Sequence, residues 1–326
     1  MDNDRETFAA SLSKAARSSL RYGLRMSVGR YQTATRLRLG PRTRSQPFFL
    51  SSVIRIKNEA RFLPELLAHH RLLGVEHFYL YDNNSTDDVA AVLQPFVEAG
   101  LATIIPWPTV PASPSCYIDF FNRYAADSEW VAFLDADEFL VEQSEGLLLD
   151  FLKSHPTWPA LAVNWTYFGS SLHERIPNGL VMSNFQLANA QMSSHVKVIA
   201  RPDQVVAYYN SHNFIYRALG VSRDVNGAPA LGSVLAWPHP GSQPIRINHY
   251  VYRSREDYMA KASGSYVDAE GARSSARREA FAEPEFRHHI AATNSFAAEA
   301  YAERVEGFLH GLGYGQPYVS TDPVAT

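Results

Sequence analysis

From residue 48 to residue 135 the chain alternates between short apolar runs and stretches in which apolar residues recur every three or four positions. Short apolar runs between turn residues are typical of buried strands, and the second pattern is typical of amphipathic helices. The predicted strands are 48–56, 75–81, 101–107 and 130–135, and the predicted helices are 62–73, 89–99 and 117–126. Regular alternation of this kind predicts an α/β fold with a mostly parallel central sheet flanked by helices, similar to a Rossmann fold.

The pattern changes after about His155 and becomes mixed α+β. Short strands are predicted at 161–168, 196–201, 205–209 and 245–252, and helices at 255–262 and 296–312. We therefore expect three regions. They are a basic extension (1–46), a catalytic-type domain (47–265, with halves 47–155 and 156–265) and a helical C-terminal region (266–326).

The first 46 residues are rich in arginine and have no acidic residue after Glu6. Arg17, Arg21 and Arg25 are four apart and would share one face of a helix. Such a face could contact anionic lipid or a protein partner. The alternative is a solvated extension, which we favour because the apolar side of this helix is thin.

Composition narrows the class of protein. A hydrophobic fraction of 46% and a net charge of -3 are ordinary for a soluble globular chain and argue against bulk nucleic-acid binding. The single cysteine, Cys116, excludes an internal disulfide framework. No apolar run approaches the roughly 20 residues of a membrane span, and no signal-peptide pattern begins the chain. We expect a cytoplasmic protein, with residues 1–46 as a candidate peripheral contact at the inner face of the membrane.

Polar clusters follow three of the predicted strands: Lys57-Asn58-Glu59, Asp82-Asn83-Asn84 and Asp135-Ala136-Asp137. In open α/β sheets the carboxyl ends of the strands form the ligand-binding edge, so these clusters should meet. Asp135 and Asp137 would point the same way in extended backbone and suit a hard divalent cation. The alternative is that they begin a helix, where acidic side chains are favoured by the helix dipole. A glycine-rich dinucleotide motif and a P-loop are both absent from the sequence.

Ordered motifs along the chain resemble glycosyltransferase family 92 and the related bacterial family-2-like glycosyltransferases. These motifs are 55–59, 63–65, 70–75, 78–88, 93–96, 130–140, 168–171, 177–181, Lys197 and 246–250. The resemblance covers residues 51–261. It departs at 261–265, the expected lid on the acceptor side, where members often have a basic, glycine-containing segment and this chain has Lys-Ala-Ser-Gly-Ser.

The resemblance implies a GT-A fold, a nucleotide-sugar donor with UDP as the expected nucleotide, and a divalent metal, Mn²⁺ or Mg²⁺. Asp135 and Asp137 would be the DxD motif that holds the metal. A histidine from the second half often completes the metal site, and His249 and His212 are the candidates, with His249 placed first. The nucleotide would be lined by Lys57, Asn58, Glu59, Asp82 and Asn83.

Sugar transfer with inversion, which the resemblance implies, needs a base within reach of the acceptor hydroxyl. Glu174, Asp224 and His173 lie in loops of the second half, and we place Glu174 first; the alternative is that Glu174 is an ordinary surface carboxylate. Asp137 is assigned a catalytic role because a metal held there would neutralise the leaving diphosphate. The Gly/Pro-rich segment 222–241 is a candidate lid over the donor.

The leading hypothesis is a metal-dependent glycosyltransferase of polysaccharide biosynthesis that acts on a saccharide acceptor. A nucleotidyltransferase also places acidic pairs and a metal beside a nucleotide, but it usually has an early glycine-rich loop, and residues 51–61 contain no glycine. A non-catalytic sugar-binding relative is the third hypothesis, and the intact pair Asp135 and Asp137 argues against it.

Overall fold

The computed structural model describes residues 46–110, 112–189, 192–235, 243–251, 253–257, 292–293 and 298–315. Outside this part lie residues 1–45, the segment 261–265 and most of the region 266–326. The predicted basic helix and the predicted acceptor-side lid are therefore not among the described residues. Among the described helices, none combines the length and the apolar character needed to cross a membrane.

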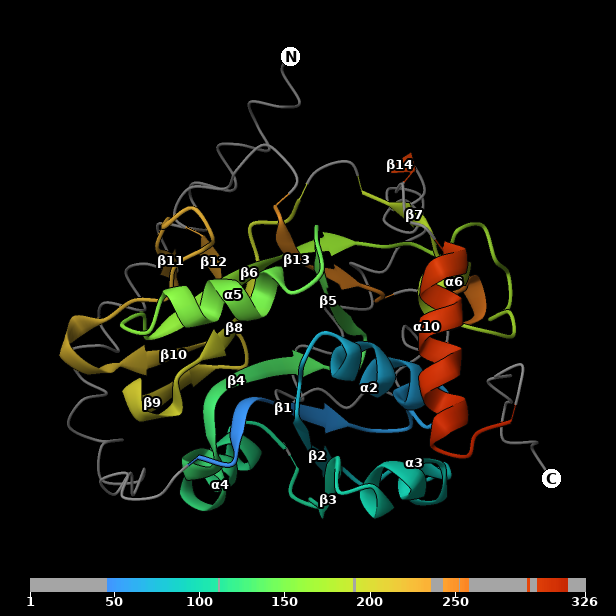
Figure 1. Cartoon of the computed structure of the whole chain (residues 1–326), viewed down its shortest axis with the longest axis horizontal. Helices are drawn as coiled ribbons and strands as arrows, with labels where there is room; N and C mark the ends of the chain where they lie inside the picture. Colours follow the sequence, from blue (N-terminus) through green and yellow to red (C-terminus); the bar gives the residue numbers. More distant parts are fainter. Residues whose placement is uncertain are drawn as a thin grey trace.

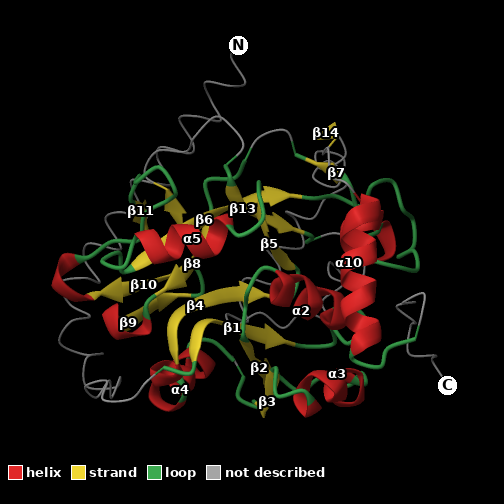
Figure 2. Ribbon diagram, in the orientation of Figure 1, coloured by secondary structure: helices red, strands yellow, loops and turns green. Residues whose placement is uncertain are grey.

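An eight-stranded sheet forms the central layer, and the strands gather between the helices in Figure 2. Its strand order is β3-β2-β1-β4-β8-β6-β13-β5. The first four strands of this order are mutually parallel, whereas β8 and β5 run against their neighbours. The bounds are β1 Phe48–Ile56, β2 His77–Asp82, β3 Ala102–Pro106, β4 Ser128–Asp135, β5 Glu138–Glu142, β6 Ala160–Tyr167, β8 Val196–Ala200 and β13 Ile245–His249.

Helices and a small hairpin cover the two faces of this sheet. One face packs against α2, α3, α5 and α10, and the other packs against α4 and the hairpin β9–β10. Figure 1 shows α2 and α5 lying across the sheet, with α10 upright beside α6. The bounds are α2 Leu63–Leu72, α3 Val89–Glu98, α4 Ser115–Arg123, α5 Leu147–Ser154, α6 Val181–Asn184, α10 Ala298–Gly311, β9 Val205–Asn210 and β10 Asn213–Tyr216.

Short elements complete the described part of the chain. Two further two-stranded ladders flank the sheet, and three 3-10 turns connect strands or helices. Their bounds are β7 Leu187–Ala188, β11 Ala230–Leu231, β12 Val234–Leu235, β14 Ala292–Thr293, η1 Ala125–Asp127, η2 Pro202–Gln204 and η3 Arg217–Leu219.

The predicted α/β fold with a mostly parallel sheet is confirmed, and one local alternative is wrong. Residues 138–142 do not begin a helix after Asp137 but form β5, which pairs antiparallel with β13. The apolar residues of β5 are buried in the same core as the rest of the sheet. Residues 138–142 therefore form a strand because they pair with β13, which is distant in the sequence. The acidic residues before them do not predict that pairing.

Glu65 of α2 connects three helices inside the core. Its carboxylate accepts the backbone N–H groups of Val181, at 2.5 Å, and Met182, at 3.0 Å, and the hydroxyl of Tyr301 donates to it at 3.0 Å. Burial raises the pKa of Glu65 to about 7, although these hydrogen bonds act in the opposite direction. The group that joins α10 to α2 and α6 therefore titrates near neutral pH.

Replacing Glu65 by glutamine is expected to change how stability depends on pH. The folded pKa of about 7 lies above the ordinary value of 4.5, so the folded protein binds more protons in that window. The free energy of unfolding of the wild type therefore loses up to about 3 kcal/mol from this group as pH rises from about 4.5 to about 7.

Urea unfolding of wild type and Glu65→Gln across this window measures the difference. Buried His69, whose pKa burial lowers to about 4, titrates in both proteins and cancels in the comparison. A difference between the two proteins that stays constant with pH would contradict the assignment.

Candidate active site

The predicted polar clusters lie at one edge of the sheet because their strands are neighbours. In the parallel pair β1–β2, Ile56 is opposite Asp82, and in the pair β1–β4, Arg55 is opposite Asp135. The residues that follow these strands therefore emerge side by side, as the sequence predicted from the carboxyl ends of parallel strands.

Asn58, Asp82 and Asn83 shape this rim through local hydrogen bonds. The side-chain oxygen of Asn58 accepts the backbone N–H of Thr86 at 2.7 Å, and Asp82 Oδ1 accepts the N–H of Ser85 at 3.0 Å. The Asn83 amide donates to the carbonyl of Trp107 at 2.7 Å. These three of the predicted nucleotide-binding residues thus hold the turn after β2 in place. The side chain of Asn58 is itself exposed.

Lys57 and Glu59, the other predicted nucleotide residues, have very different surroundings. Within the described part of the chain, the Lys57 ammonium has no hydrogen bond or ion pair. The carboxylate of Glu59 is buried and lies 2.8 Å from the guanidinium of Arg253, which also stacks over the ring of Phe62 at 3.6 Å. Lys57 is therefore available to an anion, whereas Glu59 joins the segment after β13 to the loop after β1.

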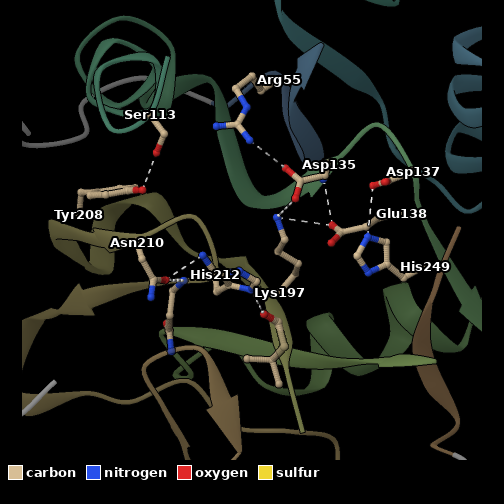
Figure 3. Close-up of polar contacts among 12 residues, drawn as sticks. Arg55, Ser113, Asp135, Asp137, Glu138, Lys197, Tyr208, Asn210, His212 and His249 are labelled. Carbon is tan, nitrogen blue, oxygen red and sulfur yellow. Dashed lines mark hydrogen bonds and ion pairs between the residues drawn. The ribbon is translucent and has the colours of Figure 1, made fainter. Parts of the chain in front are cut away.

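Asp135 is the centre of a charged network that links four strands (Figure 3). Asp135 Oδ2 lies 2.7 Å from Lys197 Nζ, and Oδ1 lies 3.8 Å from a guanidinium nitrogen of Arg55. Glu138 Oε2 accepts the backbone N–H of Asp135 at 2.9 Å and lies 3.6 Å from Lys197 Nζ. Burial alone would raise the pKa of Asp135, but the two cations outweigh it and the pKa is lowered.

Asp137 faces a different partner. Its Oδ1 lies 3.3 Å from Nε2 of His249, the last residue of β13. The main chain supports this contact, because the N–H of Tyr250 donates to the carbonyl of Asp137 at 2.8 Å. Figure 3 shows the imidazole of His249 next to Asp137 and apart from His212. Of the two histidines considered from the sequence, His249 is therefore the one that the fold brings to the acidic pair.

His212 belongs to a group of rings around Trp165. Its Nδ1 lies 2.9 Å from the carbonyl oxygen of Val196, and burial together with Lys197 lowers its pKa to about 3. The rings of His249 and His212 lie 4.4 Å and 5.0 Å from the Trp165 ring, respectively. His212 thus stays neutral and packs behind the acidic residues.

A divalent cation fits the pair Asp137 and His249. Ligands that occupy adjacent positions on a cation with bonds of about 2.1 Å are about 3 Å apart, which is close to the 3.3 Å between Oδ1 and Nε2. In the described part of the chain, no group of three or more His, Cys, Asp or Glu side chains could hold a metal. Asp135 is engaged by Lys197, so Asp137 and His249 are the two side chains of the acidic edge that are placed to contact a cation.

Sequence reasoning did not assign a site role to Lys197, Arg55 or Arg253. Lys197 had a usable signal, because it is a single cation inside the apolar strand 196–200 and a buried lysine requires an anionic partner. Arg55 and Arg253 had no such signal, since an arginine at a strand end or in a loop is usually solvated. The carboxylate partners of these two arginines are visible only in the folded structure.

The three candidate bases occupy different settings. The side chain of Glu174 is 77% exposed and lies 3.8 Å from Arg255. Asp224 is buried, and its Oδ1 accepts the backbone N–H groups of Asn226 and Ala228. His173 Nε2 lies 3.2 Å from the carbonyl of Asn184. Of the three, Glu174 alone presents an exposed carboxylate, on a loop whose backbone pairs with residues 255 and 256.

Comparison with known proteins identifies relatives of this chain. The family model described as Glycosyltransferase family 92 matches residues 56–219, which is half of the chain. A family 92 protein of rice (Oryza sativa subsp. japonica) is 28% identical over 215 residues, which is 64% of this chain and 34% of that protein. One from Arabidopsis thaliana is 27% identical over 218 residues, 63% of this chain and 35% of that protein. The chain thus spans about a third of the length of these relatives.

Solved structures similar to this chain include the Staphylococcus aureus protein TarS, residues 1–349. The crystal structure of that fragment is 14% identical with a TM-score of 0.38, covering 81% of this chain and 83% of that chain. The complex of the same fragment with UDP-GlcNAc is 12% identical with a TM-score of 0.38, covering 80% and 72%.

Proposed function

Since this chain belongs to glycosyltransferase family 92, we propose that it transfers a sugar from a nucleotide-sugar donor, with UDP as the expected nucleotide, to a saccharide acceptor. One observation supports this most directly. At the edge where β1, β2 and β4 end, the contact between Asp137 and His249 lies beside the charged network of Asp135. This arrangement suits a ligand that carries both a diphosphate and hydroxyl groups.

The donor would lie along the rim formed by the loops after β1 and β2. Lys57 is half-buried and has an ammonium that no described residue engages, so it can bind a phosphate oxygen. Asn58 and Asp82 fix the turn that faces the base and ribose. Rigid rim residues of this kind place the reacting carbon by orienting the rest of the donor.

Asp137 and His249 are the residues that would hold a divalent metal, Mn²⁺ or Mg²⁺. When bound, such a cation supplies Lewis-acid stabilisation of the negative charge that develops on the leaving diphosphate. Asp137 lies in the turn between β4 and β5, and His249 ends β13, which pairs directly with β5 so that His249 is opposite Glu138. The β5–β13 register therefore brings the two side chains together across a short turn.

Glu174 is the proposed base that accepts the proton of the attacking acceptor hydroxyl, with inversion at the sugar carbon. Its carboxylate is exposed and its loop is held by hydrogen bonds from Arg255 and Glu256 N–H groups to the carbonyls of His173 and Glu174. An exposed carboxylate can approach an acceptor without displacing the core. Ser171 and Leu172, which precede Glu174 in the same loop, have left-handed backbone with φ of 49° and 68°, which is uncommon for such residues and often marks functional loops.

Replacing Glu174 by glutamine is expected to lower kcat by about 10²-fold, because general-base assistance is worth about that factor or more. Donor binding should not change, since the carboxylate acts on the acceptor. Steady-state kinetics with a saccharide acceptor measure kcat, and calorimetry measures donor affinity. Glu256→Gln, an exposed neighbour on the paired segment, serves as the control. An unchanged kcat would remove Glu174 from the mechanism.

A donor screen tests the proposed function itself. A ligand that binds only the folded state raises its apparent stability, so thermal shifts with UDP-, GDP- and ADP-linked sugars in the presence of Mn²⁺ identify the donor. The best donor is then incubated with Mn²⁺ and saccharide acceptors, and release of the nucleoside diphosphate is followed. Release of pyrophosphate from a nucleoside triphosphate and a sugar phosphate would instead indicate a nucleotidyltransferase. Donor binding without any turnover would indicate a sugar-binding relative.

A further inference from the structure

Lys197 is a fully buried cation in the centre of the sheet. Its side chain is 1% exposed, and it lies in β8, whose other residues are apolar. Removing an ammonium from water costs several kcal/mol unless anionic partners compensate for it. The role of Lys197 is therefore expected to depend on the anionic side chains that it contacts.

The ammonium of Lys197 connects two carboxylates of the acidic motif. It lies 2.7 Å from Asp135 Oδ2 and 3.6 Å from Glu138 Oε2. Glu138 Oε2 in turn accepts the backbone N–H of Asp135 at 2.9 Å, which closes the turn from β4 to β5. In Figure 3, Lys197 reaches this turn from one side and Arg55 reaches Asp135 from the other. The orientation of the Asp135 carboxylate is thus determined by cations on both sides.

The two acids of the motif consequently have different surroundings. Asp135 Oδ2 is engaged by Lys197, and Oδ1 lies 3.8 Å from the guanidinium of Arg55. Asp137 instead contacts the imidazole of His249 at 3.3 Å. A carboxylate that already contacts an ammonium is a weaker ligand for a second cation, but its other oxygen can still accept hydrogen bonds. For Asp135 that oxygen, Oδ1, is buried and has no hydrogen-bond partner among the described residues.

This inference rests on the proposed function: we propose that Lys197 is a positioning residue that acts through Asp135. Lys197 holds the Asp135 carboxylate in the orientation in which it meets the nucleotide half of the donor, and it leaves Asp137 and His249 as the protein's part of the metal site. Because Lys197 is buried behind Asp135, it does not itself contact the donor.

A double-mutant cycle tests whether Lys197 acts through Asp135. The proteins are wild type, Lys197→Met, Asp135→Asn and the double variant, with UDP and Mn²⁺ as the probe in calorimetry. Each single variant is expected to weaken UDP binding by about tenfold, and the double variant should be no weaker than Asp135→Asn, because coupled residues are not additive. In kinetics, Lys197→Met should raise the KM of the donor by a similar factor and leave the KM of the acceptor unchanged.

Lys153→Met is the matched control, because Lys153 is an exposed lysine of α5 outside the site. It should bind UDP like the wild type. If Lys197→Met alone does not fold, Lys197→Gln replaces it throughout the cycle, because glutamine removes the charge and keeps a hydrogen-bond donor beside Asp135.

Two results overturn the inference. One is UDP affinity that Lys197→Met does not change, and the other is a further tenfold loss when Lys197→Met is added to Asp135→Asn, which would show that Lys197 acts independently. Failure of the proposed function is a separate result: the wild type would then bind none of UDP, GDP and ADP with Mn²⁺.

Discussion

Asp137→Ala is expected to lower sugar transfer by about 10³-fold while the protein remains folded. Removing one group that stabilises developing charge typically costs 10²–10³-fold in turnover, and Asp137 would provide the only carboxylate ligand of the proposed metal site. The fold should tolerate the change because the carbonyl of Asp137, not its side chain, accepts the backbone N–H of Tyr250. Nucleoside diphosphate release with Mn²⁺ measures the loss, and circular dichroism with thermal melting measures the fold.

The matched control for this variant is Asp150→Ala, which removes an exposed aspartate of α5. His249→Ala should resemble Asp137→Ala, since the two side chains are 3.3 Å apart and would bind the same cation. Mn²⁺ binding, followed by electron paramagnetic resonance without any donor, should weaken in both variants. Turnover of Asp137→Ala equal to that of the wild type would exclude this site as the catalytic centre.

Arg253→Leu is expected to lower the free energy of unfolding by about 3–5 kcal/mol, the range for breaking a buried ion pair by removing one partner. The side chain of Arg253 is 2% exposed, and its guanidinium lies 2.8 Å from Glu59 and stacks over Phe62. Leucine removes the charge and leaves the Glu59 carboxylate buried without this cation. Urea unfolding followed by tryptophan fluorescence measures the change.

An exposed ion pair provides the comparison. Arg304 lies 3.2 Å from Glu145, with side chains that are 52% and 79% exposed, so Arg304→Leu should change the free energy of unfolding by about 1 kcal/mol or less. The double variant Arg253→Leu with Glu59→Leu should recover part of the loss, because it no longer buries a lone charge. Equal effects of Arg253→Leu and Arg304→Leu would show that the buried pair is not important for stability.

The sequence by itself determined the alternating half of the fold and the location of its polar edge. Strands and helices from residue 48 to residue 135 follow local periodicity, and that periodicity is visible in one dimension. The convergence of Asn58, Asp82 and Asp135 also followed, because parallel neighbouring strands end at the same edge. Family motifs added the interpretation of Asp135 and Asp137 as a pair.

Only the tertiary structure decided which partner each of these side chains meets. Lys197 engages Asp135 because β8 enters the sheet beside β4, and His249 reaches Asp137 because β13 pairs with β5. A period of two along a strand indicates which face a residue occupies, but it does not indicate which distant strand lies next to it. Strand order depends on pairing between segments far apart in the chain, and for this reason the ion pairs of the site could not be derived from local pattern.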